Sequence, residues 1–207
     1  AETGAHVVAY EIDHGLRPVL EQVTAGLDVD LRFDDVTMVD FANEFGDGSW
    51  AMVANLPFNV GTPVVIDVIR TAPAIKTFVV MVQREVADRF AAKRGSPDYG
   101  LPSVVSSIYT DASVAFRVPP QVFYPPPRVE SAVVVMTRKR APENAKRAVE
   151  LARAGFGQRR KMLRKSLGSV LEDPASTLEE VGIDPTAWSA YWITAASRSG
   201  RRQRCGE

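Results

Sequence analysis

The tetrapeptide Asn55-Leu56-Pro57-Phe58 has the residue types needed for chemistry on an aromatic amine. It follows the apolar segment WAMVAN (50–55), which predicts a buried strand. An Asn side-chain oxygen and a backbone carbonyl, on a turn stiffened by proline, can accept both N–H bonds of an amine and aim its nitrogen at a methyl donor. Phe58 can stack on the ring. The same four residues also fit an ordinary turn after a strand, with Phe58 in the core.

Acidic side chains follow two earlier segments that predict strands. Glu11 and Ile12 end the segment 6–12, while Asp34 and Asp35 follow the segment 28–33. A carboxylate at the tip of a strand can accept hydrogen bonds from the two hydroxyls of a ribose, and one after the next strand can accept from an adenine amine. Each acid could instead be a solvated cap of the next helix.

Two further motifs lie in the second half of the chain. FYPPPRVES (123–131) is a connector made rigid by three prolines, and it can hold Phe123 over a pocket or place that ring in the core. GFGQRRKMLRKSLG (155–168) leads into a predicted helix over 158–171 whose apolar stripe packs on one side. Its cations on the other side are Arg159, Arg160, Lys161, Arg164 and Lys165.

The formal net charge of zero conceals a basic block. Eleven of the 25 Lys and Arg residues lie in 138–165, with only two acidic residues among them. Such a block indicates a surface that faces a polyanion, where phosphate contacts would position RNA without reading its sequence. A solvated helical face is the other interpretation.

Strand-like and helical segments alternate through the first two thirds of the chain, which predicts an α/β fold. We expect a mainly parallel, Rossmann-like sheet covered by helices on both faces, closed by an antiparallel pair of strands, and then a small all-α domain. The predicted boundary is at 138–139. The expected strands are 6–12, 28–33, 50–55, 75–82, 112–118 and 129–138, and the expected helices are 14–25, 62–72, 83–93, 101–110, 142–155 and 158–171.

NLPF, FYPPPRVESAVV and GFGQRRKMLRKSLG together resemble the ribosomal RNA adenine dimethylase family, and the last two segments resemble its small-subunit branch. The resemblance covers residues from about 5 to 170. It implies two methyl transfers from S-adenosylmethionine to N6 of adenines in small-subunit ribosomal RNA, within the immature small ribosomal subunit. By this resemblance, residues 1–138 would form a methyltransferase domain that starts after the family's glycine-rich cofactor loop. Residues 139–207 would form a helical rRNA-binding domain with a basic tail.

The resemblance also assigns roles to residues. Glu11 and Ile12 would bind the cofactor ribose, Asp35 and Val36 its adenine, and Asn55 the reacting end. Asn55 through Phe58 would be the catalytic motif, Phe123 would pack on the target base, and the cations of 159–165 would bind RNA. The family more often has Tyr where this chain has Phe58, so a phenolic hydrogen bond is lost while stacking is kept. The absence of the cofactor loop bears directly on whether the chain by itself binds the cofactor.

Two rival functions remain open on the sequence: a large-subunit RNA methylase of the antibiotic-resistance type, and a non-catalytic ribosome-assembly factor on the same fold. The single Cys205 excludes an intrachain disulfide and a thiolate zinc site. His6 and His14 have no partner cluster, so we expect neither a metal nor a histidine base. Without an apolar run of about 20 residues or a signal peptide, we expect a cytoplasmic monomer with no membrane contact.

Overall fold

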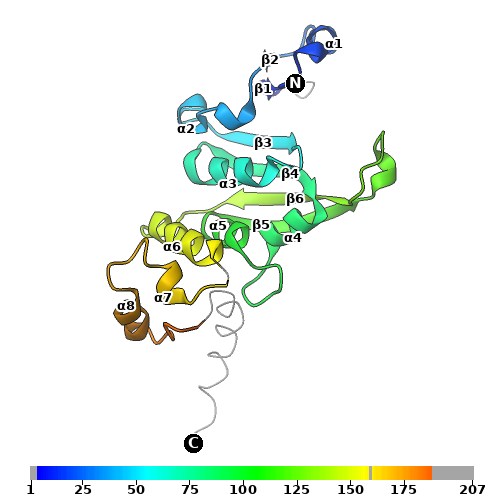
Figure 1. Cartoon of the computed structure of the whole chain (residues 1–207). Helices are drawn as coiled ribbons and strands as arrows, with labels where there is room; N and C mark the ends of the chain where they lie inside the picture. The colour runs from blue at the N-terminus through cyan, green and yellow to red at the C-terminus, as the bar shows by residue number, and fades with distance from the viewer. Residues whose placement is uncertain (1–3, 159, 188–207) are drawn as a thin grey trace, which may run out of the picture. The chain divides into compact units, whose positions relative to one another are not determined.

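The structure, a computed structural model, describes residues 4–158 and 160–187 of the 207-residue chain (Figure 1). Two compact units are formed by residues 1–46 and 47–207. The predicted domain boundary at 138–139 lies inside the second unit and stays a prediction. In the described residues no helix combines the length and apolarity needed to cross a bilayer.

The first unit contains a two-stranded parallel sheet. Strands β1 (Val7–Tyr10) and β2 (Val29–Arg32) are in register, with Tyr10 beside Arg32. Between and after them lie the helices α1 (Arg17–Val23) and α2 (Phe41–Glu44) and the 3-10 turns η1 (His14–Leu16) and η2 (Val36–Met38). Aspartates cap three of these elements, because a carboxylate accepts a backbone N–H that the first turn leaves unpaired; they are Asp13, Asp35 and Asp40.

The second unit contains a four-stranded sheet in the order β3-β4-β6-β5. Its strands are β3 (Trp50–Asn55), β4 (Ile75–Gln83), β5 (Thr110–Val118) and β6 (Ser131–Arg138). β3 and β4 are parallel, and β6 is antiparallel to both β4 and β5. The expected antiparallel pair at the end of the fold is therefore confirmed. The hydrogen-bond ladders form two sheets, however, where the sequence predicts a single one.

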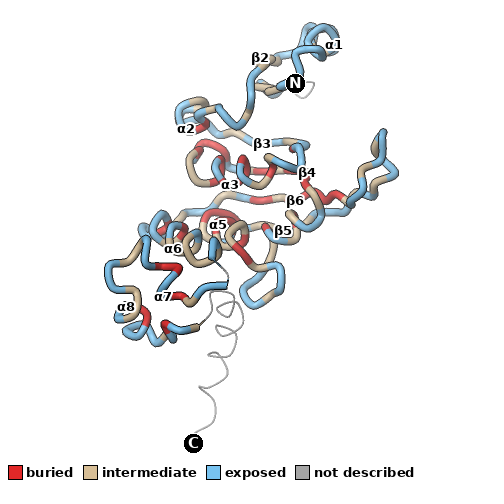
Figure 2. The backbone as a smooth tube through the Cα atoms, in the orientation of Figure 1, coloured by how far each residue is buried: buried red, intermediate tan, exposed pale blue. Residues whose placement is uncertain are grey.

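Helices cover one face of the four-stranded sheet. They are α3 (Gly61–Thr71), α4 (Arg84–Ala91) and α5 (Leu101–Tyr109), and α5 packs beside both α3 and α4. Beneath them, Phe78, Val80 and Met136 are fully buried. Figure 2 shows buried segments of this unit in α3, α5 and β6. Side chains of the other face are less buried, and Val53 on β3 is 76% exposed. In the described part of this unit the helices lie on one face, and the expectation of helices on both faces stays a prediction.

Arg138 of β6 links the end of α3 to the sheet by hydrogen bonds. Its guanidinium donates to the carbonyl oxygens of Ile75 and Ile69 at 2.6 and 2.8 Å and to those of Val68 and Ala72 at 3.3 and 2.9 Å. The last carbonyls of a helix have no partner within the helix, so one side chain satisfies the end of α3. Burial lowers the pKa of Arg138.

The C-terminal part is helical, as predicted, but it is divided differently. It contains α6 (Ala145–Gly157), α7 (Leu163–Ser166) and α8 (Pro174–Glu180). A continuous helix over 158–171 is wrong, because the Leu163 and Arg164 N–H groups donate to the carbonyls of Ala187 and Pro185 at 2.8 and 3.1 Å. The predicted apolar stripe is buried all the same, in a cluster formed by Leu163, Leu167 and Leu178 with Val170 and Leu171 against it.

Candidate functional site

The Asn55–Phe58 motif forms a corner between β3 and α3, at the carboxyl end of β3. Asn55 is the last residue of the strand and pairs with Met81 of β4. The next N–H, that of Leu56, donates to the Met81 carbonyl at 3.2 Å. The Pro57 carbonyl accepts from Val60 and Gly61 at 3.2 and 2.9 Å, which closes the turn into the helix. The corner is therefore fixed by hydrogen bonds at both ends.

Three residues of the corner are exposed, while the buried Leu56 anchors it to the core. Leu56 is buried, whereas Asn55 and Pro57 are exposed and Phe58 is 43% exposed. Within the described residues, no hydrogen bond involves the Asn55 side chain or ends on the Leu56 carbonyl. Two acceptors on a rigid turn are thus free for a ligand, which is the arrangement that binding an amine requires.

Gly61 is a functional residue that the sequence reasoning missed. A Cβ placed on Gly61 would lie 3.2 Å from the Leu56 Cβ, closer than side-chain carbons normally pack, and 3.4 Å from the Val82 Cγ1. Only glycine lets the first turn of α3 lie so close to the corner. The sequence predicts this helix over 62–72; the helix begins one residue earlier, at Gly61, with Val60 as its cap.

Phe123 lies on the arm between β5 and β6, residues 119–130, which includes the 3-10 turn η3 (Pro120–Val122). Its N–H donates to the Pro120 carbonyl at 3.1 Å, and its ring is half-buried. The neighbouring Tyr124 is fully exposed. Among the ring contacts of the described residues there is none between Phe58 and Phe123, so a sandwich of the base by these two rings stays a prediction.

In the first unit, Glu11 and Asp35 follow adjacent parallel strands at the same edge of the sheet. The Glu11 N–H continues the ladder, donating to the Arg32 carbonyl at 3.0 Å. One carboxylate oxygen of Glu11 accepts from the Asp13 N–H at 2.9 Å, and Glu11 is half-buried. Ile12 beside it is 63% exposed, and Val36 beside Asp35 is half-buried. This edge therefore combines carboxylate acceptors with apolar contact surface.

Thr37 stabilises the charged form of the Asp35 carboxylate through two hydrogen bonds. The Thr37 hydroxyl and N–H donate to the same carboxylate oxygen, Oδ1, at 2.7 and 2.8 Å. These two bonds, the hydroxyl one above all, lower the pKa of Asp35. The other oxygen has no partner among the described residues. Asp35 is thus an ionised acceptor with one oxygen available.

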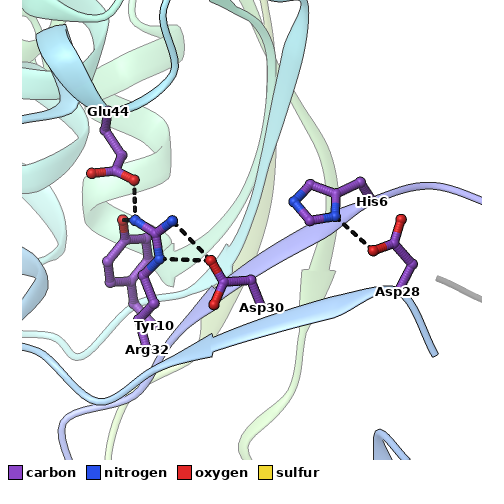
Figure 3. A network of polar contacts seen from close by, with 6 residues as sticks. All are labelled: His6, Tyr10, Asp28, Asp30, Arg32 and Glu44. Carbon is purple, nitrogen blue, oxygen red and sulfur yellow. Dashed lines mark hydrogen bonds and ion pairs between the residues drawn. The ribbon is translucent and has the colours of Figure 1, made fainter. Parts of the chain in front are cut away.

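A network of hydrogen bonds and ion pairs, drawn in Figure 3, links β1 and β2, the two strands that Glu11 and Asp35 follow. The Arg32 guanidinium donates to Asp30 at 2.8 and 3.0 Å, to the Tyr10 hydroxyl at 3.1 Å and to Glu44 of α2. These carboxylate bonds raise the pKa of Arg32. Burial, followed by the charge of Glu44, raises the pKa of Tyr10. The network ties β1, β2 and α2 together and leaves Glu11 and Asp35 outside it.

The two histidines lie in the first unit. The His6 ring nitrogen Nδ1 is 2.8 Å from a carboxylate oxygen of Asp28 (Figure 3), and the His14 ring lies 5.7 Å from that of Phe33, centroid to centroid. Each histidine therefore contacts a side chain of its own unit, an aspartate for His6 and a phenylalanine for His14.

The residues at the carboxyl edge of β1 and β2 fit the cofactor that the sequence resemblance implies. A nucleoside needs acceptors for the ribose hydroxyls and the adenine amine, and apolar contact for the base. Glu11 and Asp35 supply the acceptors, while Ile12 and Val36 supply apolar surface.

The cations predicted to bind RNA, those of 160–165, lie around α7. Arg160, Lys161, Arg164 and Lys165 are all exposed, while Leu163 and Ser166 between them are buried. Arg159 and the tail with Cys205 lie outside the described residues. The segment thus docks through its apolar side and shows the described cations to solvent, as predicted.

Comparisons with known proteins agree on one family. A family model described as "Ribosomal RNA adenine dimethylase" matches residues 1–188. A relative from Kineococcus radiotolerans, "Ribosomal RNA small subunit methyltransferase A", is 41% identical over 97% of this chain and 72% of its own length. A protein of the same name from Geobacillus thermodenitrificans is 39% identical over 89% of this chain and 69% of its own length.

A solved structure confirms the fold. The dimethyladenosine transferase from Plasmodium falciparum superposes with a TM-score of 0.64 at 22% identity, over 84% of this chain and 62% of that one. At this identity the likeness concerns the fold, and it confirms the predicted Rossmann-like class.

Proposed function

Because the chain belongs to the ribosomal RNA adenine dimethylase family, we propose that it transfers methyl groups from S-adenosylmethionine to N6 of adenines in small-subunit ribosomal RNA, giving N6,N6-dimethyladenosine. The observation that carries the proposal is the corner at the end of β3, where the Asn55 side chain and the Leu56 carbonyl accept no hydrogen bond from any described residue. The names of the relatives favour the small-subunit substrate over the large-subunit one.

In this reaction the corner orients the nucleophile. The Asn55 amide oxygen and the Leu56 carbonyl accept the two N–H bonds of the adenine amine, which pulls electron density onto N6 and stabilises the positive charge that develops there. Pro57 limits the motion of the turn, and Phe58 stacks on the base. The proton leaves the methylated amine for water, so the chain needs no strong base.

The cofactor supplies an electrophilic methyl group on its sulfonium. Glu11 and Ile12 hold its ribose, Asp35 and Val36 hold its adenine, and Asn55 borders its reactive end. Phe123, on the arm made rigid by its prolines, packs on the target base once that base has left its stack. The same residues serve both methylations, since the first product keeps one N–H for an acceptor of the corner.

The helical segment supplies affinity for the RNA. Its exposed cations Arg160, Lys161, Arg164 and Lys165, with Arg159, contact phosphates and position the immature small subunit without reading its sequence. We further propose that 1–138 is the methyltransferase domain, that 139–207 is the rRNA-binding domain, and that the chain acts as a monomer in the cytoplasm.

The experiment is to incubate the chain with S-adenosylmethionine and immature small ribosomal subunits that lack dimethyladenosine, then to digest the RNA and identify its nucleosides by mass spectrometry. The proposal expects N6-methyladenosine first and N6,N6-dimethyladenosine later. RNA binding without any methylated adenosine would favour the non-catalytic assembly factor instead. Methylation of large-subunit RNA alone would support the other rival.

A further inference from the structure

A small cavity lies beside the corner, at the same edge of the four-stranded sheet. It has a volume of about 330 Å³ and is lined by Gln83, Arg84, Glu85, Arg128, Val129 and Glu130. This is within the range of pockets that hold small ligands, about 300–1,000 Å³. Its walls are the end of β4, the start of α4 and the base of the arm that carries Phe123.

The register of the sheet places this cavity next to the amine-binding corner. Asn55 pairs with Met81, and Gln83 is two residues further along the same strand. Neighbouring strands lie about 4.8 Å apart and rise about 3.3 Å per residue, so the backbone of Gln83 is about 8 Å from that of Asn55. That separation corresponds to about one nucleotide step along an extended RNA strand.

The charges in the cavity leave one cation unpaired. Glu130 accepts from Arg84 at 3.1 Å, and the Arg84 N–H donates to the Glu130 carbonyl at 2.9 Å. Glu85 is paired with Arg89. Arg128 is exposed, and no carboxylate among the described residues lies within ion-pair distance of it. Both carboxylates of the cavity are therefore balanced, and the guanidinium of Arg128 is free for an anion.

We propose that this cavity binds the nucleotide next to the target adenosine, with its phosphate on Arg128. The inference rests on the proposed function, since it requires an RNA strand whose adenine occupies the corner. A guanidinium binds a phosphate through paired N–H donors. The Gln83 amide and Val129 offer a hydrogen-bonding group and an apolar surface to the base. The cavity thereby keeps the flanking backbone in place while one adenine is held at the corner.

The test measures whether Arg128 contacts one particular phosphate. Affinities of this chain for a short single-stranded oligoribonucleotide with one central adenosine are measured by fluorescence anisotropy. The probe is used unmodified and with a neutral methylphosphonate on the 5′ or the 3′ side of the adenosine. Each is titrated with the unaltered chain, with Arg128→Ala, and with Arg94→Ala as control. Arg94 is an exposed arginine in the loop that follows α4, outside both the basic block and the cavity.

We expect Arg128→Ala to weaken binding about fivefold to tenfold and to lower the salt slope by about 0.7, the value for one phosphate on a single strand. One of the two neutral linkages should weaken binding of the unaltered chain by the same factor and have no further effect on Arg128→Ala. Arg94→Ala should bind the RNA as the unaltered chain does, and the same neutral linkage should still weaken its binding.

Two results would overturn the inference in different ways. If the unaltered chain binds the RNA but the effects of Arg128→Ala and of both neutral linkages simply add, the cavity does not hold the flanking phosphate, and the proposed function is untouched. If the unaltered chain binds neither this RNA nor immature small subunits, the proposed function fails and the inference fails with it. Arg128→Lys, which keeps the charge, should retain the salt slope and part of the affinity.

Discussion

Gly61 packs directly against Leu56: a Cβ added to the glycine would lie 3.2 Å from the Cβ of the leucine. The contact joins the first turn of α3 to the corner that offers the Asn55 and Leu56 oxygens. Leu56 is in turn held to β4 by its N–H, which donates to the Met81 carbonyl. The position of the proposed amine acceptors therefore depends on a residue that has no side chain.

Gly61→Ala is expected to displace the corner. The added methyl group must move Leu56 or Val82, both buried, and such overpacking costs about 1–3 kcal/mol, offset in part by the better helix propensity of alanine. We expect lower methyl transfer and a free energy of unfolding reduced by about 1 kcal/mol, measured by activity and by denaturant titration. The control is Gly155→Ala in α6, where nothing lies within 4 Å of the new methyl group. That substitution should instead stabilise the chain by about 0.5–1 kcal/mol.

Asn55→Ala is expected to reduce methyl transfer by about 100-fold to 1,000-fold, the usual cost of removing one group that stabilises developing charge. The affinity for RNA and the melting temperature should change little, because the side chain is exposed and makes no hydrogen bond among the described residues. Asn59→Ala, an exposed asparagine of the same turn, is the matched control and should keep its activity. Equal losses in the two variants would mean that Asn55 has no special part in the reaction.

Arg138→Met is expected to destabilise the second unit. It would remove the guanidinium donor from the carbonyls of Val68, Ile69, Ala72 and Ile75, at a cost of about 2–3 kcal/mol in the free energy of unfolding. The Val68 and Ala72 carbonyls would keep a backbone N–H donor, so most of the cost comes from the other two. Arg138→Lys should rescue little of this, because an ammonium cannot reproduce the planar fork. Arg140→Met, an exposed neighbour, should change stability by no more than about 0.5 kcal/mol.

Asp35 is expected to titrate below its ordinary value of 3.8, because the Thr37 hydroxyl and N–H stabilise its charged form. A lowered pKa in the folded state means that these bonds stabilise the fold above that ordinary value, and that their contribution is lost as the pH falls through the lowered pKa. Thr37→Val should raise the pKa of Asp35 in a carboxyl ¹³C NMR titration. Asp184, whose pKa is lowered in the same way by Thr186, should be unaffected and serves as the internal control.

Replacing Arg160, Lys161, Arg164 and Lys165 together by Glu is expected to weaken binding to ribosomal RNA and to flatten its salt dependence, by up to about 0.9 in slope for each phosphate that these cations neutralise. All four side chains are exposed, so the circular dichroism spectrum and the melting temperature should be preserved. An unchanged slope would show that these four cations do not contact the RNA. Replacing Lys76, an exposed lysine at the start of β4, by Glu is the control for added negative charge.

Local sequence was sufficient to predict most helices and strands and the corner itself. The run WAMVAN predicts β3 with its observed bounds, because alternating and β-branched residues favour a strand and NLPF ends it. The proline-rich arm and the apolar stripe of Leu163 and Leu167 were likewise visible, since these properties depend on residues close together in the chain. The residue types of the corner also indicated which chemistry it could perform.

Only the tertiary structure decided which strands pair and which groups meet. β6 lies between β4 and β5, and the predicted helix 158–171 is interrupted before Leu163. Gly61 approaches Leu56 closely. The first two features depend on contacts between segments distant in sequence, and the third depends on how the corner folds back on α3. The cavity at Arg128 likewise needs the end of β4 and the base of the arm together. Periodicity and motif spacing report what a segment prefers by itself, whereas hydrogen bonding and close packing are settled by the partner that the fold brings to it.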